Sequence, residues 1–143
     1  MAFRFLFLTL IFNLIVAQFD WIDDGAPIRQ GQHIEWQRGA ADGQAGEIIF
    51  AWSDTRDSMR DVYIQKIDVQ GNRLWGEKGV AVTTAYGRQE DPLIVGDDNG
   101  GAFVVWIDYR SEPDTKGDVY AQHILSNGDL VWSLEGQPIV VKD

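Results

Sequence analysis

The sequence contains no cysteine, and this absence excludes several kinds of chemistry at once. A disulfide framework, a thiolate metal site, a cysteine nucleophile and a lipidated cysteine are all impossible. Because secreted domains of this size often rely on disulfides, the chain has to be stabilised by a packed core, by repeat stacking or by oligomerisation. Export without cysteine favours a bacterial envelope or exterior over a eukaryotic extracellular module.

Basic residues are few, with 12 Lys plus Arg against 22 Asp plus Glu and a net charge of −10. Nucleic-acid binding requires clustered cations, so a nucleic-acid partner is not expected. Three catalytic or phosphate-binding patterns are also missing from the sequence: Gly-x-Ser-x-Gly, His-Glu-x-x-His and the phosphate-cradling glycine loop. These absences indicate a non-enzymatic protein without a resident cofactor.

Long apolar runs are missing except at the N-terminus, where Arg4 precedes an almost wholly apolar stretch over residues 5–16. The stretch is shorter than the roughly 20 apolar residues that a membrane-spanning helix needs. Ala17 is a small residue suited to the position before a cleavage site. The pattern predicts a signal peptide over residues 1–17, with an uncleaved anchor as the alternative. The mature chain is then expected to be secreted, surface-located or periplasmic, without contact with a membrane.

What the chain does contain is an internal repeat. The pattern Trp-x-Asp-x-Arg at residues 52–56 returns at residues 106–110, and Asp-Val-Tyr-x-Gln at residues 61–65 returns at residues 118–122. A glycine and, four residues after it, a tryptophan follow each copy. The copies are 54 to 57 residues apart. A repeat of about this length is typical of propellers, solenoids and other arrays built from one supersecondary unit.

Each unit reads as four short strands. The runs at 47–52 and 102–107 are rich in β-branched and aromatic residues, and turn signals such as Asn127-Gly128 separate the apolar segments. The expected strands span residues 34–38, 46–53, 61–68 and 72–84 in the first unit, and 91–96, 101–108, 118–125 and 129–141 in the second.

The fourth-strand pattern Trp-x-x-x-Gly-x-x-[Val/Ile] occurs three times, at residues 21–28, 75–82 and 132–139. The mature chain therefore opens with a fourth strand that lacks its own first three. The sequence predicts the following division: a signal peptide at 1–17, an orphan fourth strand at 18–28, a first blade-like repeat at 29–84 and a second at 85–143.

The full pattern stands at residues 100–110 as Gly-Gly-Ala-Phe-Val-Val-Trp-Ile-Asp-Tyr-Arg, followed by residues 118–122 and by a Gly-x-x-x-Trp segment at 128–132. It resembles the secreted propeller-type repeat proteins of bacterial surfaces. The resemblance implies an all-β fold of two four-stranded antiparallel propeller-like blades plus one extra N-terminal strand. A small β-sandwich or an open repeat array is the alternative. Such repeats are scaffolds with variable loops, so the resemblance implies no particular activity.

Two blades cannot close a ring, and open sheet edges tend to pair with other chains. We therefore expect self-association through exposed strand edges, unless the chain is part of a longer repeat protein or its two sheets pack as a sandwich.

The repeated polar pairs Asp54/Arg56 and Asp108/Arg110 are the first candidates for a ligand site, because an Arg fork recognises carboxylates and sugar hydroxyls. The alternative is that each Asp caps a turn while each Arg pairs with a nearby acidic residue. Trp36 falls outside the repeat and is a further binding candidate. The recurring tryptophans are expected in the core or between units: Trp52, Trp75, Trp106 and Trp132.

The loops after these pairs are acidic, which raises the alternative of a calcium site. Its candidate ligands are Asp57 and Asp61 in the first unit and Asp114 and Asp118 in the second. Calcium requires six to eight oxygen ligands, and the neighbouring basic residues would compete with it. Solvated turns and ion pairs are the other interpretation.

The sequence thus predicts an exported, non-enzymatic repeat module for binding or assembly at the cell surface or exterior, with a glycan or surface protein as partner. A carbohydrate-binding lectin completed by oligomerisation is one alternative. A fragment of a larger propeller hydrolase is the other.

Overall fold

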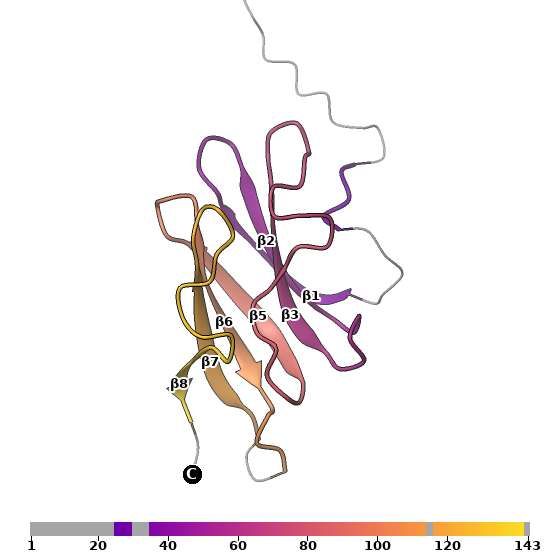
Figure 1. Cartoon of the computed structure of the whole chain (residues 1–143), viewed down its shortest axis with the longest axis vertical. Helices are drawn as coiled ribbons and strands as arrows, with labels where there is room; N and C mark the ends of the chain where they lie inside the picture. Colours follow the sequence, from indigo (N-terminus) through magenta and orange to yellow (C-terminus); the bar gives the residue numbers. More distant parts are fainter. Residues whose placement is uncertain (1–24, 30–34, 114–115, 142–143) are drawn as a thin grey trace, which may run out of the picture.

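The computed structural model describes residues 25–29, 35–113 and 116–141. This part of the chain is all-β, with two four-stranded antiparallel sheets that do not close into a barrel (Figure 1). The first sheet has the order β1 (Glu35–Asp42), β2 (Ile48–Asp54), β3 (Asp61–Ile67) and β4 (Val80–Ala81). The second has the order β5 (Gln89–Gly96), β6 (Ala102–Asp108), β7 (Asp118–Ile124) and β8 (Gln137–Val140).

The two sheets follow the repeat in the sequence, each built from one unit in chain order. In the first, Asp54 at the end of β2 pairs with Asp61 at the start of β3, and in the second Asp108 pairs with Asp118 in the same way. The predicted pair of four-stranded units is confirmed, and the arrangement also fits the small β-sandwich named as its alternative. No helix in the described ranges is long and apolar enough to cross a membrane.

The predicted bounds of the outer strands were wrong. β1 and β5 are longer than expected, whereas β4 is reduced to two residues and β8 to four. The tryptophan-to-glycine stretch of each fourth segment forms turns, because Gly79 and Gly136 have φ angles of 72° and 75° that extended backbone does not use. A Cβ at Gly79 would lie 2.5 Å from the carbonyl oxygen of Ile64, so the chain touches β3 before it extends.

The predicted orphan strand at 18–28 lies mostly outside the described residues, as does the predicted signal peptide. Residues 25–29 form no strand pairing within the part of the chain that the structure describes. Gly25 nevertheless has a φ of 83°, the left-handed geometry seen at Gly79 and Gly136. The segment lies against the first sheet, where Arg73 donates a hydrogen bond of 3.0 Å to the Pro27 carbonyl.

The core lies between the sheets and combines residues from both units. β5 packs across β1, β2 and β3 of the first sheet. The buried apolar residues at this contact include Ile49, Ala51, Val62, Ile64, Trp75, Val82, Ala102, Val104, Trp106 and Ile124. As predicted, Trp52, Trp75 and Trp106 are buried, whereas their counterpart Trp132 is only half-buried. The same repeat position is therefore buried in the first unit, at Trp75, and partly exposed in the second, at Trp132.

Candidate functional site

The predicted Asp–Arg pairs lie where β2 and β6 end, and each belongs to a closed polar cluster. Asp54 is fully buried. Its Oδ2 accepts a hydrogen bond of 2.9 Å from the Trp52 indole N–H, and Arg56 donates to the same carboxylate from Nε and Nη2 at 2.6–3.1 Å. The Arg56 backbone N–H also donates to Oδ1, so the carboxylate caps the turn that follows β2.

The remaining contacts of Arg56 hold this loop against neighbouring segments. Its guanidinium carbon lies 3.6 Å from the centre of the Tyr63 ring, and its Nη1 donates a hydrogen bond of 2.7 Å to the Lys78 carbonyl. The Arg29 Nε lies 3.4 Å from Asp54. One buried carboxylate thus joins the strand end, the following loop and the N-terminal segment.

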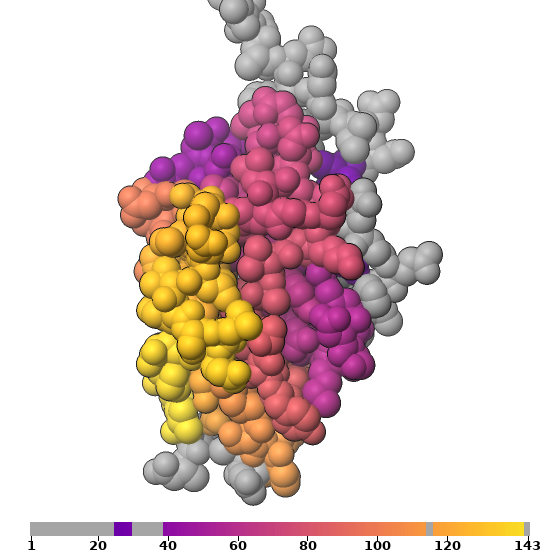
Figure 2. Space-filling model, in the orientation of Figure 1, coloured from indigo at the N-terminus to yellow at the C-terminus, as the bar shows by residue number. Residues whose placement is uncertain are grey.

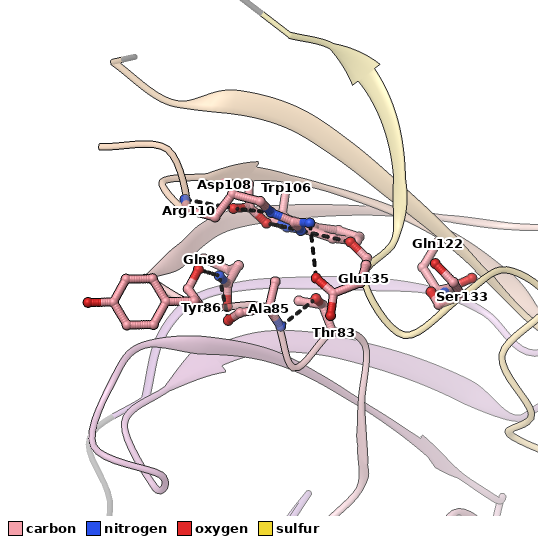
Figure 3. A network of polar contacts seen from close by, with 10 residues as sticks. All are labelled: Thr83, Ala85, Tyr86, Gln89, Trp106, Asp108, Arg110, Gln122, Ser133 and Glu135. Carbon is pink, nitrogen blue, oxygen red and sulfur yellow. Dashed lines mark hydrogen bonds and ion pairs between the residues drawn. The ribbon is translucent and has the colours of Figure 1, made fainter. Parts of the chain in front are cut away.

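The second unit repeats this arrangement around Asp108, and Figure 3 shows this second copy. Trp106 and Arg110 both donate to the Asp108 carboxylate, at 2.9 Å from the indole and 2.7 Å from Nη2. The Arg110 guanidinium carbon lies 3.9 Å from the centre of the Tyr120 ring, and Nη2 of Arg110 donates a hydrogen bond of 2.7 Å to the Glu135 carbonyl.

The electrostatics of the clusters agree with this geometry. Burial raises the pKa of Asp54, but hydrogen bonds from Arg56 and Trp52 outweigh it and hold the pKa below the ordinary value. Burial lowers the pKa of Arg110, and the bond and charge of Asp108 outweigh it in the same way. In each unit the carboxylate and the guanidinium group are thus held together as an ion pair.

These contacts give each Asp–Arg pair a structural role, and a ligand at them stays a prediction. The backbone of Trp36 pairs with Ser53 in the first sheet, and its side chain lies outside the described part of the structure.

A cavity of about 480 Å³ opens beside the clusters, at the junction of the two units. It is lined by Met59 and Arg60 from the first unit, by Tyr86 and Arg88 from the connection, and by residues of the loop after β6. We call this cavity the junction groove. Its volume is within the range of small-ligand sites in proteins.

The charged side chains of the junction groove form one network around Arg88. Its guanidinium carbon lies 3.8 Å from the centre of the Tyr109 ring. Its two terminal nitrogens lie 3.4 Å from Glu90 and 3.2 Å from Glu112, and Arg60 also pairs with Glu90. Two guanidinium groups therefore face two carboxylates, and the lining has almost no net charge.

Tyr86 stands at the edge of the groove with 79% of its surface exposed. Figure 3 shows its ring pointing away from Gln89, Ala85 and Thr83. The backbone that carries the ring is fixed, because the buried amide of Gln89 donates to the carbonyls of Ala85 and Tyr86 at 3.3 Å. Gly87 follows with a φ of 87°, close to the backbone of Arg110. An exposed ring is thus held on a rigid turn.

A second cavity of about 400 Å³ lies on the other side of Tyr86 and Met59 and is lined by Asp57, Asp61 and Tyr63. Burial, followed by the charges of Asp57 and Asp54, raises the pKa of Asp61 to about 6. The Tyr63 hydroxyl donates to Asp57 at 2.7 Å, and burial and this bond raise the pKa of Tyr63. The acidic second cavity thus lies next to the junction groove, whose charged side chains balance.

The residues described here include no group of three or more acidic or histidine side chains placed to hold a metal ion. Asp57 and Asp61 share one cavity, whereas Asp118 belongs to the other unit. Asp114 lies outside the described residues. Within the described ranges, the candidate calcium ligands therefore do not form one cluster.

The sequence analysis missed the groove residues Tyr86, Arg88 and Tyr109, although a signal was present. The positions 54 residues earlier hold Gln32, Ile34 and Thr55, so all three residues depart from the repeat. The criterion that singled out Trp36 would also have found them.

Comparison with known proteins identifies no relative, since no family model, no curated protein and no solved structure matches this chain.

Proposed function

We propose that this chain is an exported, non-enzymatic binding module that holds a carbohydrate in the junction groove. The observation that carries the proposal is the groove itself, in which an exposed aromatic ring and a charge-balanced polar network occupy positions that differ between the units. The repeated clusters stabilise the scaffold, and the departures from the repeat supply the recognition.

The lining favours a neutral, hydroxylated ligand. Arg60 and Arg88 offer fixed N–H donors, and Glu90 and Glu112 offer carboxylate acceptors. Because these charges balance, neither a strongly anionic nor a strongly cationic ligand gains from the site as a whole. The exposed face of Tyr86 provides apolar contact for the C–H groups of a sugar ring. This combination of an apolar ring and mixed polar partners suits a carbohydrate.

The test is a glycan array probed with the purified chain and with Tyr86→Ala. We expect the wild-type chain to bind one group of glycans, and Tyr86→Ala to weaken that binding about tenfold through loss of ring contact. Tyr86→Phe keeps the ring and should retain most of the affinity. Because Tyr86 is largely exposed, both variants should melt at the wild-type temperature.

Two results would refute the proposal. One is that the wild-type chain binds no glycan on the array. The other is that Tyr86→Ala binds the same glycans as tightly as the wild type, which would move recognition away from the groove.

A further inference from the structure

The face of the second sheet that points away from the first carries an apolar surface. Leu93 and Val95 on β5 are 73% and 61% exposed, and Phe103 on β6 is 37% exposed. Register joins them, since Leu93 pairs with Val105 and Val95 pairs with Phe103. We call this surface, together with Trp132, the outer face of the second unit.

The equivalent face of the first unit is covered along β2. Ile49 and Ala51, which lie 54 positions before Phe103 and Val105, are 0% exposed and pack in the core between the sheets. The same repeat positions are therefore buried by a following unit in one case and open in the other.

The tryptophans show the same difference. The Trp75 indole N–H donates a hydrogen bond of 3.2 Å to the carbonyl of Ser126, which belongs to the second unit. Its ring lies over Gly128, where a Cβ would approach within 2.9 Å. The counterpart Trp132 is half-buried, and its indole N–H has no acceptor among the described residues. Trp132 thus occupies the repeat position that forms the contact between units at Trp75, but no described residue covers it in the same way.

An aromatic cluster occupies the centre of the outer face. The His123 ring stacks on Phe103, with 4.2 Å between centroids and 18° between planes, and Trp132 lies 6.3 Å from Phe103. The equivalent of His123 in the first unit is Lys66, which reaches across the sheets and donates to the Gly100 carbonyl at 2.9 Å. His123 therefore occupies the repeat position at which Lys66 of the first unit contacts the second unit.

The contact between the sheets also shows what fits such a face. The second unit covers the first with Ala102 and Val104 of β6, both fully buried. The equivalent positions in the first unit are Ile48, which is 36% exposed, and Phe50, which is half-buried. The chain therefore carries both halves of one kind of contact, on different sheets.

We propose that the outer face of the second unit docks the first unit of a second copy of this chain, head to tail. The contact is heterologous, so it closes into a ring or extends as a filament. It does not depend on the carbohydrate proposal. Residues 25–29 of the incoming copy share the pattern Gly-x-Pro-Ile with residues 136–139, which include most of β8. The two segments therefore compete for pairing with β7, and one displaces the other. β8 is suited to displacement, because all four of its residues are exposed at one side of the molecule (Figures 1 and 2).

The test measures the mass of the exported chain by light scattering over a range of concentrations. We expect the wild-type mass to rise above that of a monomer as concentration increases. Leu93→Glu places a charge on the outer face, and Ile48→Glu places one on the opposing surface. Each should weaken association at least tenfold. The matched control is Gln70→Glu, which adds the same charge in an exposed turn of the first unit and should leave association unchanged.

Mixing the two variants tests the direction of the contact. Leu93→Glu keeps the surface around Ile48, and Ile48→Glu keeps the outer face, so the mixture should form a heterodimer and stop there. Circular dichroism melts check that each variant is folded. A wild-type chain that stays monomeric at every concentration would overturn the proposal. So would association that Leu93→Glu leaves unchanged, or a contact that Ile48→Glu alone does not affect.

Discussion

At the scale of single residues, the buried carboxylates Asp54 and Asp108 organise the molecule. Each receives hydrogen bonds from a tryptophan two residues before it and an arginine two residues after it. The spacing Trp-x-Asp-x-Arg achieves this because the strand continues as far as the Asp and the chain then turns back. The sequence located these residues correctly, but their mutual contacts required the turn geometry.

Replacing Asp54 with asparagine should lower the free energy of unfolding by about 3 kcal/mol. The substitution keeps the shape but leaves the largely buried guanidinium of Arg56 without its counter-charge. Chemical denaturation at neutral pH measures the change. The control Asp98→Asn alters an exposed turn and should stay within about 0.5 kcal/mol of the wild type. Equal effects from the two substitutions would show that the cluster contributes nothing special to stability.

Asp61 makes stability depend on pH in the opposite sense from a paired carboxylate. Its folded-state pKa of about 6 lies above the ordinary value of 3.8, so the folded state binds the proton more tightly than the unfolded state does. The stability that protonation provides is present below pH 4 and is lost as pH rises to about 6.

Asp61→Asn removes this loss. We expect the variant to melt a few degrees above the wild type at pH 7.5 and close to it at pH 4. Calorimetry at the two pH values measures the difference. A shift that is the same at both would contradict the raised pKa.

At the scale of elements, the fourth segments differ most from the sequence-based prediction. Their apolar spacing suggested strands of 13 residues each, whereas the strand pairing with β3 and β7 is reduced to Val80–Ala81 and Gln137–Val140. Single bridges at Arg73 and Leu130 add one contact to each strand. The periodicity of a sequence shows which residues are apolar. It does not show that a glycine must adopt a positive φ where the chain contacts the adjacent strand. The pairing of the second strand with the third was predictable in each unit, because its register runs without a shift. The first pairing was less predictable, since β1 and β5 each contain a register shift and Asp91 in β5 has a φ of 54°.

Gly136→Ala should destabilise the protein by more than Gly76→Ala. Both glycines have a positive φ, of 75° and 79°. A Cβ at Gly136 would also lie 2.6 Å from the buried Trp106 ring, whereas nothing lies within 4 Å of one at Gly76. We expect about 1 kcal/mol for Gly76→Ala from backbone strain alone, and clearly more for Gly136→Ala. Thermal melts of the two variants compare them directly, and equal losses would show that the contact with Trp106 does not matter.

At the scale of the whole molecule, one unit occurs twice, and the junction groove is lined by positions at which the two copies differ. The repeat predicted the two sheets and their order. It could not predict the junction groove, because Met59, Tyr86 and Tyr109 come from three loops that meet only through the packing of one sheet on the other. It could not reveal the open outer face either, since the sequence of a covered face and that of an uncovered face are equally apolar.

We propose that the repeated residues form the scaffold and that the departures from the repeat carry recognition. Chemical-shift mapping by NMR, with a glycan selected on the array, tests this most directly. We expect shifts at Tyr86, Arg88 and Tyr109, with the Trp52 and Trp106 indole signals unchanged. Shifts centred on the two indoles, with the groove unaffected, would contradict it and return the binding site to the repeated Asp–Arg pairs.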